Sequence, residues 1–156
     1  MKQLLLVRHG KAADDSPQGD FGRELKKSGV ADVEQVSTQL KAKNLNIETI
    51  ITSDAARAKA TARIIADHLN ISNTAEDHRI YEAGDNTLLK IITSIDEQYH
   101  SVMLAGHNPG FSSIATYLSG QFINLHTSGA VLLQFDFDSW QEVSASTGRI
   151  VWESES

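Results

Sequence analysis

The pattern of apolar and polar positions begins with a wholly apolar run at Leu4–Val7, followed directly by Arg8, His9 and Gly10. A short run of this kind predicts a β-strand that is buried on both faces, as in a parallel sheet covered by helices. The strand is expected to end where polarity begins, and the glycine lets the backbone turn sharply close to a ligand. Arg8 and His9 are therefore predicted at the carboxyl end of a central strand, where open α/β sheets bind their ligands.

Further along the chain, short apolar runs alternate with longer segments whose apolar residues recur at helical spacing. This alternation predicts an α/β fold, a three-layer sandwich with a mainly parallel central sheet, as a single domain over residues 1–156. The expected strands are residues 4–7, 47–52, 77–81, 101–105, 130–137 and 149–152, with the last two forming an edge hairpin. The expected helices are about residues 28–43, the stretch from a predicted cap at Ser53–Asp54 to residue 69, 87–95 and 109–118.

Polar side chains follow each of the first four predicted strands. They are Arg8–His9, Ser53–Asp54 with Arg57 one helical turn later, Glu82, and His107–Asn108. Because the carboxyl ends of parallel strands lie at one edge of a sheet, residues about a hundred positions apart are expected to meet in one cleft. Each cluster alone is also typical of a helix cap or a solvated turn, but four at successive strand ends favour a shared site.

The composition narrows the functional classes. With 40% hydrophobic and 22% charged residues, the chain is typical of a globular protein. A formal net charge of −6 argues against a nucleic-acid partner, which requires a basic face. The absence of cysteine excludes disulfides, thiolate metal sites and thiol nucleophiles. The apolar N-terminal run is too short for a signal peptide or a membrane span, so we expect a cytoplasmic protein with no membrane partner.

Two arginines, two histidines and a carboxylate in one cleft are side chains suited to phosphoryl transfer. The planar guanidinium group binds two phosphate oxygens at once and stays charged at any working pH. One histidine in the right tautomer is a nucleophile for phosphorus, and the other can hydrogen-bond the transferring oxygens. The sequence has no P-loop pattern and no carboxylate cluster at metal-ligand spacing, so we expect a site without metal or other cofactor.

Three motifs occur along the chain in a specific order. They are Leu6-Val7-Arg8-His9-Gly10, Ser53-x-x-x-Arg57-Ala58-x-x-Thr61 and Gly106-His107-Asn108-Pro109. Their order resembles that of the histidine phosphatase superfamily, which has the phosphoglycerate mutase-like fold. The short length, Arg23-x-Leu25-x-x-x-Gly29 and Tyr81-Glu82-Ala83 are similar to the SixA group of phosphohistidine phosphatases. The resemblance implies that His9 is the nucleophile and becomes transiently phosphorylated, and that Arg8, Arg57 and His107 form the phosphate pocket.

Some positions leave alternatives open. The Ser-Pro that usually precedes the second arginine in the family is Ser53-Asp54 here. Asp54 is expected to cap the following helix, the alternative being that its charge weakens phosphate binding. Glu82 matches the place of the proton donor in larger family members, and Asp85 is a rival for this role. Arg23 is expected either to reach the substrate or to anchor its loop.

The expected function is that of a metal-independent phosphatase working through a phosphohistidine intermediate on His9. The resemblance implies a substrate of phosphohistidine on a protein, so the expected partner is a phosphorylated protein. One alternative is a phosphatase for a small phosphate ester; a sugar-phosphate mutase fits less well, because its members carry long insertions over the substrate. Another alternative is a non-catalytic module that docks a phosphorylated partner, which predicts a damaged nucleophile or phosphate pocket.

Overall fold

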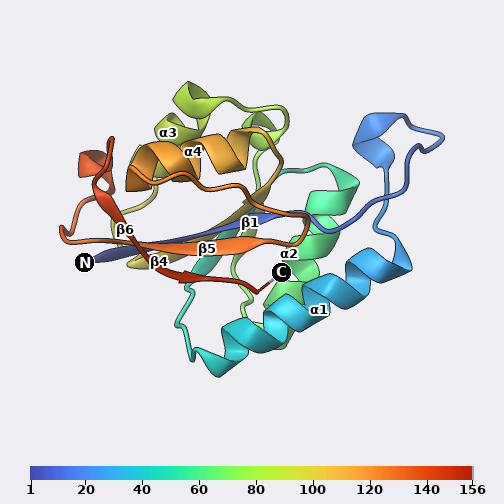
Figure 1. The fold of residues 1–156 in the computed structure, drawn as a ribbon, viewed down its shortest axis with the longest axis horizontal. Coiled ribbons are helices and arrows are strands. Elements are labelled where there is room, and N and C mark those ends of the chain that lie inside the picture. Colours follow the sequence, from blue (N-terminus) through green and yellow to red (C-terminus); the bar gives the residue numbers. More distant parts are fainter. Residues whose placement is uncertain (156) are drawn as a thin grey trace.

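The computed structural model describes residues 1–155, so Ser156, the last residue of the predicted domain, lies outside the described residues. Six strands form one mixed sheet in the order β3-β2-β4-β1-β5-β6 (Figure 1). The strands are β1 (Lys2–Arg8), β2 (Thr49–Thr52), β3 (Thr74–Glu76), β4 (Ser101–Gly106), β5 (Ala130–Phe135) and β6 (Gly148–Glu153). The helices are α1 (Lys27–Ala42), α2 (Ala56–Leu69), α3 (Asp85–Thr93) and α4 (Gly110–Ser119).

β1 lies at the centre of the sheet, as its apolar sequence predicts. It pairs in parallel with β4, with Leu4 opposite Val102 and Val7 opposite Ala105, and it pairs antiparallel with β5. The four residues from Leu4 to Val7 are fully buried. β2 and β3 continue the parallel part of the sheet beyond β4, and β5 and β6 form the antiparallel pair predicted at the other edge.

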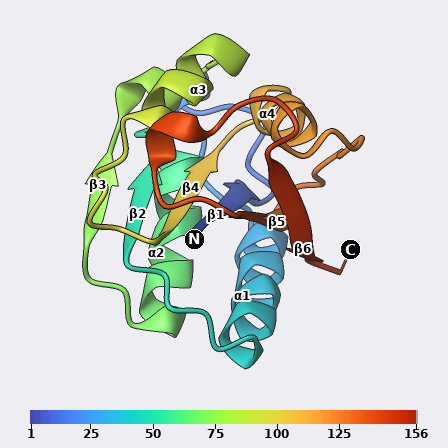
Figure 2. The ribbon, with the colours of Figure 1, turned by 90° about the vertical axis from the view of Figure 1, so that its left-hand side faces the viewer.

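Helices cover both faces of the sheet, which confirms the predicted three-layer architecture (Figures 1 and 2). Successive side chains of β1 point to opposite faces, as in any strand. Leu4 and Leu6 belong to a cluster with residues of α3 and α4, whereas Leu5 and Val7 pack with residues of α1 and α2. These two apolar layers bury both faces of the sheet, so the polar residues lie where the strands end.

The prediction for the third strand is wrong. β3 precedes the predicted strand at 77–81, and that segment instead contains a 3-10 turn. The Asp77 side chain stabilises this turn by accepting a hydrogen bond from the backbone N–H of Arg79 at 3.0 Å. All three residues of β3 are exposed, so no apolar pattern reveals the strand in the sequence. Glu82 consequently does not follow a strand end.

The start of α2 also differs from the prediction. The helix begins at Ala56, with Ala55 at the N-cap position, and Asp54 does not cap it. The hydroxyl oxygen of Ser53 accepts a hydrogen bond from the backbone N–H of Ala55 at 3.2 Å. The carboxylate of Asp54 instead accepts a hydrogen bond at 2.9 Å from Nδ1 of His78, 24 residues further along the chain. A tertiary contact has thus replaced the local cap that sequence favours.

The carboxyl ends of β1, β2 and β4 meet at one edge of the sheet, as predicted. The backbone N–H of His9 donates to the carbonyl of Gly106 at 3.0 Å, and that of Ser53 donates to the carbonyl of Ala105 at 2.9 Å. Pairing therefore continues past the strands and brings the segments that follow them together. Within residues 1–155, no helix is long and apolar enough to cross a membrane.

Candidate active site

His9 is held by the turn that leaves β1. Its side chain is 9% exposed, and Nδ1 lies 2.8 Å from the carbonyl oxygen of Gly10. Because a carbonyl only accepts hydrogen bonds, this contact assigns the proton to Nδ1 and leaves the lone pair on Nε2. The pKa of His9 is lowered from 6.5 to about 4, mainly by burial; the Gly10 contact opposes this shift, and the nearby arginines add to it. At neutral pH the ring is thus uncharged, and Nε2 carries the lone pair that can act as a nucleophile.

Arg57 lies directly beside that nucleophile. It is the second residue of α2 and is 6% exposed, and its Nε donates to Nε2 of His9 at 3.3 Å. The helix is anchored to the end of β1 by Thr61, whose hydroxyl accepts from the backbone N–H of Gly10 at 3.0 Å and donates to the carbonyl of Arg57 at 2.8 Å. These two hydrogen bonds fix the arginine relative to the histidine.

His107 forms the opposite wall. Its ring is 8% exposed, with its centroid 5.1 Å from that of His9, and its Nε2 lies 2.8 Å from the hydroxyl of Ser53. Ser53 accepts from Ala55, so its own proton is free to go to Nε2, in which case Nδ1 of His107 carries the ring proton. Burial lowers the pKa of His107 to about 3, and the neighbouring His9 and Arg57 add to this effect.

Arg8 reaches the site from the last position of β1. Its charge contributes to the lowered pKa values of both His9 and His107. Its Nη1 donates to the carbonyl oxygen of Leu125 at 3.1 Å, and the side-chain amide of Asn108 donates to the same oxygen at 2.9 Å. Asn108 therefore positions the carbonyl that holds Arg8, which is a reason for an asparagine directly after His107.

Asp20 is a site residue that sequence reasoning missed. Its carboxylate accepts hydrogen bonds from the hydroxyl of Tyr81 at 2.5 Å, from Nη1 of Arg23 at 2.8 Å and from Nη2 of Arg57 at 3.2 Å. The Tyr81 and Arg23 hydrogen bonds hold the pKa of Asp20 far below its usual range. Asp20 is therefore ionised at neutral pH, with its charge against the guanidinium of Arg57. The loop after β1 also contains Asp14 and Asp15, and no local pattern distinguishes Asp20 from them.

Tyr81, which donates to the Asp20 carboxylate, packs against other aromatic rings of the site. The Tyr81 ring lies edge-on to His107 at 5.6 Å between centroids and edge-on to Phe21 at 5.2 Å. The hydrogen bond to Asp20 raises the pKa of Tyr81. Arg23 donates from Nε to the carbonyl of Ala13 at 2.5 Å as well as to Asp20, so of its two expected roles the structure supports the anchor of the loop.

The two candidate proton donors lie apart from these contacts. Glu82 is exposed and, across residues 1–155, its carboxylate makes no hydrogen bond or ion pair. Its backbone has a φ of 58°, a conformation that L-residues adopt rarely. Asp85 lies in the first turn of α3 and accepts a hydrogen bond from Ser113 of α4 at 3.0 Å. Neither carboxylate contacts His9, Arg57 or His107.

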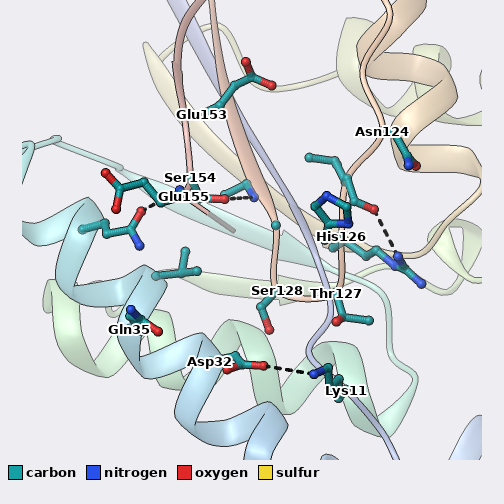
Figure 3. A pocket seen from close by; sticks show the side chains of 16 residues that line it. Lys11, Asp32, Gln35, Asn124, His126, Thr127, Ser128, Glu153, Ser154 and Glu155 are labelled. Atoms are coloured by element: carbon teal, nitrogen blue, oxygen red, sulfur yellow. Dashed lines mark hydrogen bonds and ion pairs between the residues drawn. The ribbon is translucent and has the colours of Figure 1, made fainter.

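A cavity of about 760 Å³ lies on the other side of Arg8, between α1, the loop at residues 124–129 and the end of β6 (Figure 3). His126 faces this cavity, as the picture shows, and neither catalytic-candidate histidine lines it. Among the described residues, the cavity included, no group of three or more histidine and acidic side chains is placed to hold a metal ion.

The arrangement is suited to binding an oxyanion. Arg8 Nε and His107 Nδ1 are buried and have no hydrogen-bond partner among residues 1–155. A buried donor without a partner costs free energy, about 1–3 kcal/mol, unless a ligand satisfies it. A tetrahedral anion beside His9 Nε2 would accept from both atoms and from Arg57. Such donors stabilise the charge that develops on equatorial oxygens during phosphoryl transfer.

Comparison with known proteins identifies relatives of this chain. The family model of the histidine phosphatase superfamily (branch 1) matches residues 4–111. An uncharacterized chloroplastic protein from Arabidopsis thaliana is 31% identical over 165 residues, covering 99% of this chain and 76% of that protein. An uncharacterized protein from Mycobacterium leprae is 25% identical, covering 93% of this chain and 96% of its own length.

Solved structures show the same fold. A putative phosphohistidine phosphatase SixA from Agrobacterium tumefaciens has a TM-score of 0.85 at 24% identity, covering 99% of this chain and 98% of that one. The protein histidine phosphatase SixA complexed with tungstate has a TM-score of 0.83 at 23% identity, covering 97% and 95%. These similarities confirm the predicted phosphoglycerate mutase-like fold. Because the matching family model spans His9, Arg57 and His107 together, the chain belongs to the histidine phosphatase superfamily.

Proposed function

We propose that this protein is a metal-independent phosphatase that transfers the phosphoryl group of phosphohistidine on a protein to His9 and then to water. The family and the fold support phosphatase activity. The observation that carries the mechanism is the fixed tautomer of His9, whose Nδ1 bonds the Gly10 carbonyl while Nε2 faces Arg57. The set of Arg8, Arg57 and His107 is intact, which favours an enzyme over a non-catalytic docking module.

In the first step, the lone pair of His9 Nε2 forms a bond to phosphorus while the bond from phosphorus to the leaving nitrogen breaks. The positive charge that develops on the His9 ring is stabilised by its Nδ1–H bond to the Gly10 carbonyl. Arg57, Arg8 and the Nδ1–H of His107 bind the phosphoryl oxygens. In the second step, water attacks phosphorus, the electron pair returns to Nε2, and both water protons leave with the phosphate.

The position of Asp20 indicates how the phosphate enters. Its carboxylate occupies Nη2 of Arg57, 3.2 Å away, and the Asp20 carbonyl occupies Nη1 at 2.8 Å. Phosphate oxygens and this carboxylate are anions that compete for the same guanidinium group. The substrate phosphoryl group therefore either displaces the Asp20 side chain or takes over the Nε–H that Arg57 donates to Nε2 of His9. Asp20 weakens anion binding in the first case.

The leaving group is the reason to favour phosphohistidine. A phosphate ester expels an alkoxide, which needs a well-placed acid. The carboxyl group of Asp20 contacts Arg57, and its lowered pKa keeps it ionised, while Glu82 makes no contact there. A phosphohistidine protonated on its second ring nitrogen leaves as neutral imidazole and needs no acid from the enzyme. Of the SixA structures that share this fold, one is named a putative phosphohistidine phosphatase and another a protein histidine phosphatase, which agrees with this choice.

The test compares substrates that differ in their leaving group. The purified protein is given a phosphohistidine-bearing peptide, a matched phosphoserine peptide and phosphoglycerate, each with and without EDTA. We expect the phosphohistidine peptide to be hydrolysed fastest, at a rate that the chelator leaves unchanged. A clear preference for one ester would instead assign a small-molecule phosphatase.

His9→Gln is the matched variant, because glutamine retains a similar size and polarity without a nucleophilic ring nitrogen. It should abolish turnover and the phosphoryl label that a rapid, acid-free quench traps on the wild-type protein, while the thermal unfolding transition persists. Turnover close to wild type in this variant would refute the covalent mechanism.

A further inference from the structure

The cavity beside Arg8 is not used by the proposed reaction, although it is joined to the catalytic residues through the backbone. The backbone N–H of Ser128 donates to the carbonyl of His9 at 3.0 Å, and that of Arg8 donates to the carbonyl of Gly129 at 2.9 Å. Arg8 itself lines the cavity of about 760 Å³. A ligand that fills this space therefore contacts the segment next to the nucleophile.

The charges of the cavity are unevenly placed. Lys11 and Asp32 form an ion pair at 4.0 Å and largely cancel one another (Figure 3). Glu153 and Glu155 line the cavity at the end of β6 (Figure 3), and Arg8, which donates to the carbonyl of Leu125, lines it next to the loop at residues 124–129. One wall thus carries two carboxylates and another carries the guanidinium group that is proposed to bind phosphate. A ligand with a cation on one side and a phosphate on the other matches this distribution.

The acidic wall is held in place by hydrogen bonds. The backbone N–H of Ser154 donates to the carbonyl of Ala130 at 2.9 Å, and its hydroxyl accepts from the backbone N–H of Ala130 at 2.9 Å. The backbone N–H of Glu155 donates to the side-chain oxygen of Gln39 on α1 at 3.1 Å. The segment that carries Glu153 and Glu155 is consequently fastened to β5 and to α1.

The loop between the cavity and the turn after β1 is closely packed. Ser128 is 3% exposed, and its Oγ is buried without a hydrogen-bond partner among the described residues. This oxygen lies beside Gly10, 3.1 Å from the position that a β-carbon on the glycine would take. The loop that borders the cavity is therefore packed against the segment that holds His9.

We propose that this cavity recognises a lysine or arginine side chain of the phosphorylated protein, with the cation against Glu153 and Glu155 while the phosphohistidine lies beside His9. The inference rests on the proposed function and names the sequence around the phosphohistidine that the enzyme prefers. Because Arg8 lines the cavity and directly precedes His9, the basic residue is expected within a few positions of the phosphohistidine.

The experiment uses phosphohistidine peptides in which a single lysine is moved through each position around the phosphohistidine of an otherwise uncharged sequence. Norleucine replaces lysine in the reference peptide, because it keeps the aliphatic chain and removes the charge. We expect one or two lysine positions to raise kcat/KM about fivefold, the effect of a favourable exposed ion pair, through a lower KM. N-phosphorylated imidazole, which is too small to reach the acidic wall, serves as the substrate that reports the chemical step alone.

Two double variants with the same change in net charge test whether Glu153 and Glu155 bind the lysine side chain. Glu153→Gln with Glu155→Gln should reduce the ratio of kcat/KM for the lysine peptide to kcat/KM for the norleucine peptide to about one. The same double variant should leave the hydrolysis of phosphorylated imidazole unchanged. Glu76→Gln with Glu142→Gln is the control, because both residues are exposed, one on β3 and one in the 3-10 turn at Trp140–Glu142, and neither lines the cavity. The control should keep the wild-type preference.

The outcomes separate the two proposals. If the lysine and norleucine peptides are hydrolysed equally well at every position, or if both double variants lose the preference alike, the recognition role of this cavity is refuted while the phosphatase assignment stands. If no phosphohistidine peptide is hydrolysed but a phosphate ester is, the proposed substrate class is refuted, and the inference with it.

Discussion

Lowering the pH from 7.5 to about 5.5 should leave His9 almost entirely uncharged, because burial lowers its pKa to about 4. With that pKa, about 97% of the ring is neutral at pH 5.5, whereas an ordinary histidine of pKa 6.5 would be only about 9% neutral. The tenfold difference in competent nucleophile is large enough to measure. The neutral fraction of His9 at pH 5.5 therefore distinguishes a histidine buried among arginines from a solvent-exposed one.

Histidine-specific NMR is the direct assay. Protein labelled with ¹⁵N in its histidines is titrated from pH 7.5 downward, and His9→Gln identifies the signals of His9. We expect the Nε2 and Nδ1 shifts of the neutral Nδ1–H tautomer to persist below pH 5.5. Kinetics alone are less decisive, because a substrate phosphate group also titrates near pH 6. A His9 midpoint between pH 6 and 7 would refute the reasoning from burial.

Stability should depend on pH for the same reason. Between pH about 6.5 and 4, the unfolded chain binds a proton at His9 that the folded protein does not, so the free energy of unfolding falls as the pH falls through this window. From pH 7.5 to 5, His9 alone should cost about 2 kcal/mol. Urea unfolding of the wild type and His9→Gln at both values measures this; an equal loss in the two proteins would contradict the prediction.

Three substitutions test the other site contacts. Arg57→Ala should lower kcat/KM about 10²–10³-fold, the scale of removing one oxyanion donor, in protein whose thermal unfolding shows that it is folded; a loss below tenfold would contradict its role. Asp20→Asn removes a carboxylate 3.2 Å from Arg57, so inorganic phosphate should inhibit about fivefold more strongly, and an unchanged inhibition constant would rule out competition. Glu82→Gln should alter phosphohistidine hydrolysis less than about twofold, as for an exposed side chain free of contacts; a much larger loss would make Glu82 the proton donor.

The central part of the fold could be predicted because its signal is local. Leu4–Val7 can be buried on both faces only in the middle of a covered sheet, and the polar residues that follow must then lie at its edge. The same holds for the segments that end in Ser53 and His107. Parallel pairing through β4 then brings His9, Arg57 and His107 together without further information.

β3 and Glu82 show where local patterns are insufficient. β3 is an exposed edge strand of three residues, and hydrogen bonds to β2 define it rather than apolar side chains. A strand is expected at residues 77–81, but the Asp77 side chain and the burial of Ile80 stabilise a 3-10 turn instead. The expected place of Glu82 at a strand end depended on that incorrect prediction.

The sequence by itself thus determined which strand is central, which residues follow the strand ends and which charges are available for phosphate. Only the tertiary structure decided that Asp20 faces Arg57 and Tyr81, which are 37 and 61 positions away. It also decided that His9 carries its proton on Nδ1 and that burial lowers its pKa. Periodicity reports the burial of a residue's own segment, whereas hydrogen-bond partners and pKa depend on side chains that meet only after the layers have packed.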